Sequence, residues 1–350
     1  MRNARKLASI VAGVLAFSLI AAACGGDDEE PGGSTGGQTG TTGATGEDLT
    51  GTITISGSST VEPISSLVAE LFNELQPGVA ISVDGPGTGD GFELFCQGEI
   101  DISDASRPID EEEVAACKKA GINYVELEVA FDGITVMTSP ENTGVTCLNL
   151  GDLYALFGPE SEGFSSWSDA DDLATQVGGN GGFPDEPLEI TAPGEESGTY
   201  DAFIELTGIE DIAIAQGVPE DAAAALRPDY QSSANDNVII QAMEGSPSAI
   251  GFAGFAFAES AGEAIKEIEV DGGSGCVAPS AETIADASYP LSRSLFIYVN
   301  TDKVAENPAI AAYVDFYLSD EGLSTSVGEA GYVNLPADRI EAVRSAWAGV

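Results

Sequence analysis

The chain reads TITISGSSTVEPISSLVAELFNELQPGVAISV from residue 52 to residue 83. Residues 52–56 alternate polar and apolar side chains, which predicts a strand, and residues 61–75 repeat apolar side chains at helical spacing. The Pro77-Gly78 pair ends this helix, and residues 79–83 form a second apolar strand. A strand, a helix and a strand in this order predict a parallel sheet, so we expect an α/β fold.

Four short turns rich in glycine and hydroxyl groups follow predicted strands: residues 57–60, 85–89, 105–108 and 194–199. The first lies at the carboxyl end of its strand, where open α/β sheets bind ligands. Glycine-rich turns and helix N-termini present free N–H groups to anions. The turns therefore predict a cage of donors that holds a small oxyanion without a metal or a cofactor.

Similar strand, turn and helix units recur after residue 139, and the chain then returns to its first part. This pattern predicts two α/β lobes joined by two crossover hinge strands that close on a ligand. Lobe I is expected to contain residues 51–138 and 253–350, and lobe II residues 139–252. Before the first crossover, strands at 124–129 and 134–138 are expected to flank a turn at Phe131-Asp132-Gly133.

The first residues are predicted to be a targeting segment. Residues 1–23 contain a basic start and an apolar stretch too short to cross a membrane comfortably, as in a signal peptide. They lead into Ala-Ala-Ala-Cys, which resembles a bacterial lipobox and implies cleavage before Cys24 and a lipid on its sulfur; a plain secretory peptide is the alternative. Residues 24–50 form a flexible acidic linker. We expect an exported protein anchored by lipid to the outer face of the cytoplasmic membrane.

Composition excludes several functions. The chain has 58 Asp and Glu against 12 Lys and Arg, a net charge of −46, which argues against a nucleic acid partner and against membrane contact through side chains. It has no His, so it lacks Ser-His-Asp catalysis and His-ligated zinc. We expect no enzyme activity. An anion must be captured here by short-range hydrogen bonds and dipoles, against the repulsion of the protein's own charge.

Four cysteines follow Cys24: Cys96, Cys117, Cys147 and Cys276. An even number in an exported chain indicates two disulfides, and four cysteines allow three pairings. The pairing Cys96–Cys117 with Cys147–Cys276 is favoured, because it closes one local loop and ties a distant return segment to a crossover strand. A zinc site built from all four thiolates is the competing interpretation, weakened by the absence of a C-x-x-C pair.

Taken together, four motifs resemble the PstS family of phosphate-binding proteins: Gly-Ser-Ser-Thr-Val at 57–61, Gly-Thr-Gly at 87–89, Asp-Ile-Ser-Asp-Ala-Ser-Arg-Pro-Ile at 101–109 and Ser-Gly-Thr at 197–199. The resemblance covers about residues 51–336. It implies a bilobed, periplasmic-binding-protein-like (type II) fold. It also implies a monomer that binds inorganic phosphate and delivers it to the permease subunits of an ABC transporter.

The resemblance also implies the phosphate-binding residues, which are Ser59, Thr60, Val61, Thr88, Ser106, Arg107, Asp132, Ser197, Gly198 and Thr199. Ser59 and Thr60 equally suit an N-cap of the helix at 61–75. Many members carry an arginine just before the Ser-Gly-Thr turn, which this chain lacks, so Arg107 and Asp132 are expected to replace the usual pair. A carboxylate that accepts the proton of monohydrogen phosphate would reject sulfate. Asp104 and Asp236 are rival acids, although Asp236 is better explained as an N-cap.

Three other functions remain open. The ligand could be sulfate or another tetrahedral oxyanion bound by the same fold. The protein could be a surface or sensor protein that binds phosphate without transport. It could also be a metal-dependent phosphate-ester hydrolase that uses Asp and Glu ligands in place of His.

Overall fold

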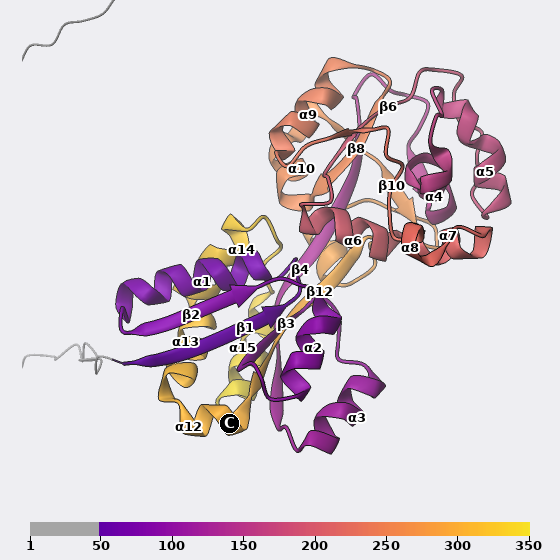
Figure 1. The fold of residues 1–350 in the computed structure, drawn as a ribbon. Coiled ribbons are helices and arrows are strands. Elements are labelled where there is room, and N and C mark those ends of the chain that lie inside the picture. The colour runs from indigo at the N-terminus through magenta and orange to yellow at the C-terminus, as the bar shows by residue number, and fades with distance from the viewer. Residues whose placement is uncertain (1–48) are drawn as a thin grey trace, which may run out of the picture. The chain divides into compact units, whose positions relative to one another are not determined.

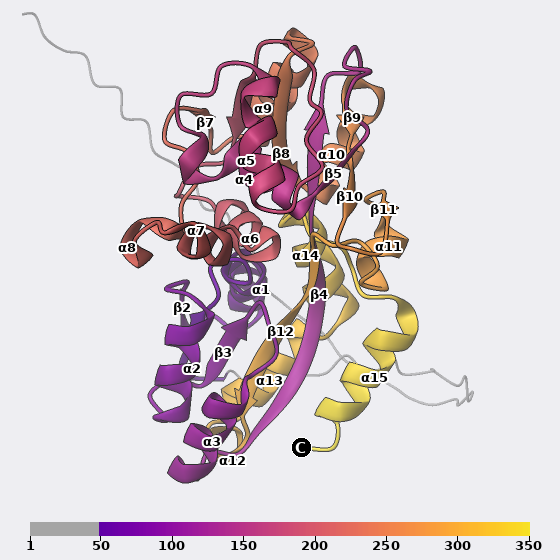
Figure 2. The ribbon, with the colours of Figure 1, turned by 90° about the vertical axis from the view of Figure 1, so that its right-hand side faces the viewer.

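The computed structural model describes residues 49–350. The predicted signal peptide, Cys24 with its predicted lipid, and nearly all of the predicted linker lie outside the described residues. Within them the fold is mixed α/β, built on a nine-stranded sheet in the order β2-β1-β3-β12-β4-β8-β6-β7, with β9 paired to β4. A second sheet has the order β11-β10-β5. Figures 1 and 2 show the elements of the larger sheet and the helices that flank them.

Strands and helices alternate at the start of the described chain, as predicted. The elements are β1 (Gly51–Gly57), α1 (Glu62–Leu75), β2 (Val79–Asp84), α2 (Thr88–Cys96), β3 (Ile102–Ala105) and α3 (Glu111–Ala120). Strand β1 pairs in parallel with both β2 and β3, and Ile53 lies opposite Ile81. Because the three strands are parallel, their carboxyl ends lie at one edge of the sheet.

Helix α1 shows why this segment folds as it does. Ile64, Val68 and Phe72 recur every four residues, and all three are buried. Glu62 places negative charge in the first turn, and the helix ends before Pro77. Its buried face packs on α13 (Pro308–Tyr317), where the rings of Phe72 and Tyr313 lie 5.5 Å apart, edge to face.

The expected turn at residues 131–133 is wrong. Strand β4 runs without a break from Tyr124 to Thr138 and passes from one group of elements to the other (Figure 1). Its first part pairs with β12 (Ser292–Asn300), and its last five residues pair with β8 (Ala249–Gly254). Asp132 lies opposite Arg293 in this register, so pairing with a distant strand keeps the segment extended.

The second group of elements follows β4 in the chain. It contains β5 (Cys147–Asn149), α4 (Leu150–Phe157), α5 (Asp171–Gln176), β6 (Glu189–Ala192), α6 (Gly198–Thr207), α7 (Ile209–Gln216), α8 (Glu220–Ala223), β7 (Gln231–Ser232), α9 (Asp236–Gly245), β8 and α10 (Phe255–Ala261). Strand β6 pairs in parallel with β7 and β8. Figure 2 shows α6 next to α1 and β3, and the start of α6 approaches the turn after β1 at Ser59.

The segment after α10 indicates where the chain leaves the second group of elements and returns to the first. It forms β9 (Lys266–Glu267), β10 (Glu269–Asp271), β11 (Cys276–Val277) and α11 (Ala281–Ala285). Strand β9 pairs with the last part of β4, and β10 pairs with β5. From the sequence, these residues were expected in lobe I. Their pairing with the second group leads us to propose that lobe II extends to about residue 285.

Helices complete the C-terminal part of the described chain. They are α12 (Thr301–Glu306), α13, a π-helical turn at Asp320–Ser324, α14 (Thr325–Glu329) and α15 (Ala337–Trp347). No helix in residues 49–350 combines the length and the apolar character needed to span a membrane.

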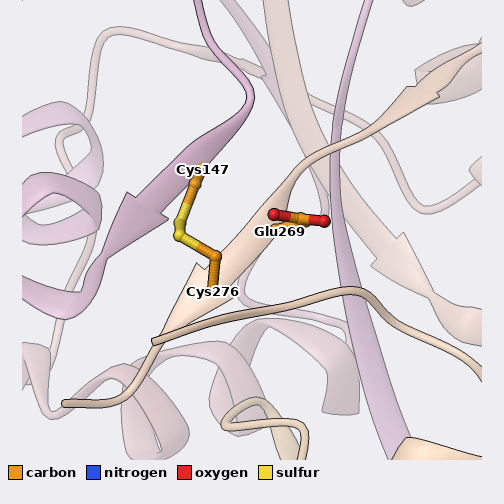
Figure 3. Close-up of side chains that lie close together, drawn as sticks. All are labelled: Cys147, Glu269 and Cys276. Carbon is orange, nitrogen blue, oxygen red and sulfur yellow. A yellow bond between two sulfur atoms is a disulfide. The ribbon is translucent and has the colours of Figure 1, made fainter. Parts of the chain in front are cut away.

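Two disulfides join Cys96 to Cys117 and Cys147 to Cys276, which is the pairing that the sequence analysis favoured. The second links β5 to β11, with the carboxylate of Glu269 beside it (Figure 3). The sulfurs of Cys147 and Cys276 are bonded to each other, so neither is a free thiolate that could bind a metal. All four cysteines form disulfides, so a zinc site built from their thiolates is excluded.

We expect the double variant Cys147→Ser/Cys276→Ser to lower the free energy of unfolding by about 2–4 kcal/mol. The reason is that this bond joins residues 129 apart in sequence, so it restricts the unfolded chain over a long loop. Urea unfolding measures the change. The matched control is Cys96→Ser/Cys117→Ser, whose bond spans only 21 residues and is expected to cost less. A larger loss in the control would rule out loop closure as the cause.

Candidate functional site

A cavity of ≈ 330 Å³ lies where the predicted turns meet. Its lining residues are Ser58, Ser59, Thr60, Gly87, Thr88, Gly89, Ser106, Arg107, Asp201, Glu205 and Arg293. The first eight come from the turn after β1, from the N-cap and first turn of α2, and from the turn after β3, at the carboxyl edge of the parallel strands. Sheet topology therefore brings together three of the four turns that the sequence analysis singled out.

Hydroxyl groups form much of this wall. Thr88 Oγ1 lies 3.0 Å from Ser106 Oγ and accepts the N–H of Ser106 at 3.2 Å. Thr60 is 2 % exposed and Ser106 is 6 % exposed. Each hydroxyl can donate one bond and accept others, so the wall can turn several O–H donors toward an oxyanion.

Arg293 is the buried cation of the site, and the sequence analysis missed it. Its side chain is 9 % exposed. Its Nη2 donates to Thr60 Oγ1 at 2.9 Å, and its Nε donates to Asp132 Oδ2 at 3.2 Å. Its Nη1 forms an ion pair with Glu205 of α6. A planar guanidinium held in this way can offer several N–H donors to oxygen atoms.

Asp132 is placed differently from the expectation. Its side chain is 5 % exposed, it is not among the cavity-lining residues, and its carboxylate contacts Arg293. Burial raises the pKa of Asp132, and the charge and hydrogen bond of Arg293 oppose that rise. The geometry makes Asp132 the group that holds Arg293 in place.

Arg107 lines the cavity, but its guanidinium hydrogen-bonds to Glu113. Its Nη1 and Nη2 donate to the two carboxylate oxygens of Glu113 at 2.8 and 2.7 Å. The guanidinium also lies over the ring of Phe92, 5.5 Å from its centre. The hydrogen bond to Glu113, above all, raises the pKa of Arg107. Glu113 in turn closes a capping box with Asp110 at the start of α3, so this pair also has a structural role.

The Ser-Gly-Thr turn begins α6 beside the cavity. Ser197 is the N-cap of α6 and accepts the N–H of Thr199. A Cβ on Gly198 would lie 3.2 Å from the carbonyl oxygen of Ser59, so glycine allows the close approach of α6 to the Ser59–Thr60 turn. None of the three residues lines the cavity itself.

Val61 lies with its side chain in the core. Its side chain is fully buried, and its N–H donates to the carbonyl oxygen of Ser58 at 3.1 Å. Val61 is also the N-cap of α1, without a side-chain capping bond. The alternative role of Ser59 and Thr60 as N-caps is therefore not seen in the structure.

The rival acids both lie away from the cavity lining. Asp104 is fully buried, and its Oδ1 accepts from Ser65 Oγ at 2.9 Å. Asp236 is the first residue of α9, and Asn235 is the N-cap. The carboxylates that do line the cavity are Asp201 and Glu205, which the sequence analysis did not single out.

A larger groove of ≈ 820 Å³ lies between α2 and α3, but its chemistry does not suit an anion. It is lined by Gly89, Phe92, Glu93, Cys96, Gln97, Glu99, Glu112, Glu113, Ala116, Lys119 and Ala120. Four glutamates face it against a single lysine. The smaller cavity, which gathers hydroxyls and Arg293, is the candidate site.

Comparisons with known proteins show the family of this chain. Residues 40–321 match the family model described as a PBP superfamily domain. The phosphate-binding protein PstS of Staphylococcus haemolyticus is 33% identical over 92% of this chain and 90% of its own. The chain belongs to the PstS family. Protein SphX of Synechocystis is 40% identical over 82% of this chain and 79% of its own. The solved structure of a possible phosphate-binding protein from Planctomyces limnophilus has 37% identity and a TM-score of 0.75, covering 86% of this chain and 99% of its own.

One sequence signal could have revealed Arg293 in this PstS-family chain. Only nine Lys and Arg residues follow the predicted signal peptide, since three of the 12 precede residue 24. Arg293 stands among them at the entry to an apolar strand, where a charge needs a partner. Asp201 and Glu205 carry a weaker signal, because acidic residues are common along this chain.

Proposed function

We propose that the chain is a solute-binding protein that captures inorganic phosphate outside the cytoplasmic membrane and delivers it to an ABC-type phosphate permease. The observation that carries the proposal is the cavity in which hydroxyl groups from three turns meet the buried guanidinium of Arg293. Membership of the PstS family supports phosphate as the ligand and a transporter as the recipient.

In this proposal, the hydroxyl-bearing wall of the cavity holds the phosphate oxygens. The hydroxyls of Ser59, Thr60, Thr88 and Ser106 donate to them, and Arg293 supplies the charge. Charge-assisted bonds of this kind contribute about 1.5–3 kcal/mol each. Arg107 lies at the rim, the turn at 197–199 adds donors from the start of α6 beside the cavity, and Asp132 keeps Arg293 oriented.

The proposal includes no chemical step. The chain has no His to activate a nucleophile, and binding followed by release is sufficient for delivery. We further propose that a lipid on Cys24 tethers the protein near the permease and that the protein acts as a monomer.

The decisive measurement is calorimetric titration of the ligand-free protein with inorganic phosphate and then with sulfate. We expect one-to-one binding of phosphate and little heat with sulfate. We expect Thr88→Val to weaken phosphate binding roughly 10-fold, because it removes a hydroxyl at the cavity wall. Thr175→Val on exposed α5 is the matched control and is expected to bind normally.

Three results would contradict the proposal. Absence of phosphate heat would remove phosphate as the ligand. Sulfate binding alone would change the ligand within the same fold. Turnover of a chromogenic phosphate ester would indicate a hydrolase.

A further inference from the structure

Helix α6 turns two carboxylates toward the wall that carries the donors. Asp201 and Glu205 are four residues apart, so they share one face of the helix, and both line the cavity. Ser59 Oγ donates to Asp201 Oδ2 at 3.2 Å. Glu205 forms an ion pair with Arg293. Each carboxylate therefore contacts a residue that is proposed to bind the ligand.

Carboxylates outnumber cations at the site before any ligand is counted. Arg293 contacts the carboxylates of Asp132 and Glu205, and Arg107 contacts that of Glu113. Within residues 49–350, Asp201 has no cationic partner at ion-pair distance. A dianion entering this cavity would add two further negative charges beside two carboxylates, which is unfavourable in a partly buried site.

A protonated ligand lessens this conflict, because it carries one negative charge fewer. A phosphate oxygen that carries a proton can donate a hydrogen bond to a carboxylate, whereas a bare oxygen only repels it. Two carboxylates one helical turn apart can accept from two such P–OH groups. The opposite wall, with its hydroxyls and Arg293, can donate to the remaining oxygens.

We propose that phosphate binding at this cavity is coupled to proton uptake, so that phosphate is held as the dihydrogen monoanion with Asp201 and Glu205 as acceptors of its protons. This inference rests on the proposed function. At a pH where free phosphate is mostly the dianion, the additional proton comes from the solvent. One O–H bond forms on the phosphate. The bond between that proton and the buffer acid breaks.

Several other charged or titratable groups surround the two carboxylates. They are Arg293 of β12, Asp132 of β4, Arg107 after β3, Tyr200 of α6 and Tyr332, which lies close to Asp132 and Arg293. Burial raises the pKa of Asp201; the Ser59 hydrogen bond and Arg293 oppose this rise, and Glu205 adds to it. A carboxylate in these surroundings is more stable when it accepts a hydrogen bond from a protonated ligand than when it lies next to a second anion.

The test counts protons by calorimetry on the purified protein. Inorganic phosphate is titrated near pH 8 in several buffers that differ in ionisation enthalpy, and the slope of observed heat against that enthalpy gives the protons taken up. We expect about one proton per phosphate. In Asp201→Asn/Glu205→Gln the uptake is expected to fall toward zero. Glu244→Gln, on the exposed end of α9, is the matched control and is expected to keep the full uptake.

The outcomes separate this inference from the proposed function. Phosphate binding without net proton uptake overturns the inference and leaves phosphate as the ligand. Uptake that is unchanged in the double variant also overturns it, because the protons then reside elsewhere. Absence of phosphate binding overturns the proposed function and this inference with it.

Discussion

Arg293→Met is expected to weaken phosphate binding roughly 100-fold or more, since it removes charge-assisted donors from the cavity. It is also expected to lower the free energy of unfolding by about 3–5 kcal/mol, because it leaves the carboxylate of Asp132 buried without its partner. Calorimetry with phosphate measures the first effect, and urea unfolding monitored by circular dichroism measures the second.

Two further variants separate the two effects. Arg293→Met/Asp132→Asn removes the unpaired charge, so it should recover much of the stability but not the phosphate binding. Arg339→Met removes an arginine that is 50 % exposed and paired with Glu128 at the surface, and it should lose at most about 1 kcal/mol and no affinity. Normal phosphate binding by Arg293→Met would remove Arg293 from the site.

Asp104→Asn is expected to stabilise the protein increasingly as the pH rises from 5 to 8. Burial raises the pKa of Asp104 to about 8, opposed in part by the hydrogen bond from Ser65. Its Oδ2 is buried without a hydrogen-bond partner among the residues that the structure describes. The folded protein therefore keeps this carboxyl protonated while the unfolded chain ionises it above about pH 4.

The sign follows from linkage. A raised pKa in the folded state contributes stability that is fully present below the unfolded pKa and is lost as the pH rises toward the folded pKa. Across the window from about pH 4 to pH 8 this loss is on the order of 5 kcal/mol. Asparagine has nearly the same shape and no proton to lose, so the variant avoids the loss.

Urea unfolding of the wild type and of Asp104→Asn at several pH values between 5 and 8 tests this prediction. The difference in unfolding free energy should grow by about 1.4 kcal/mol per pH unit. Asp90→Asn, on the exposed side of α2, is the matched control and should show no comparable trend. A difference that stays constant with pH would show that Asp104 is already ionised in the folded protein.

Local patterns in the chain were enough to predict much of the fold. The alternation at 52–56, the helical spacing at 61–75 and the apolar run at 79–83 correspond to β1, α1 and β2. These patterns are reliable because the buried face of each element is set by residues that lie within a few positions of one another. The same reasoning located three of the turns that line the cavity.

The roles of the charged residues could not be deduced in this way. Asp132 was expected in a turn as an acceptor of the ligand's proton, yet it lies within β4 and holds Arg293, which is 161 positions away. Val61 was expected to donate its N–H to the ligand, but in the structure this N–H donates to the carbonyl oxygen of Ser58. Asp201 and Glu205 gain their place only because α6 approaches the turn after β1.

The division has a physical cause. Strand and helix formation, the choice of parallel connections and the hydroxyl-rich turns depend on neighbours in the sequence, so the order of residues specifies them. Which carboxylate meets which guanidinium depends on the pairing of β4 with β12 and on the approach of α6 to β1, and both bring together segments more than a hundred residues apart. Ion pairs and proton acceptors are decided by distances of a few ångströms, which exist only once those segments have packed.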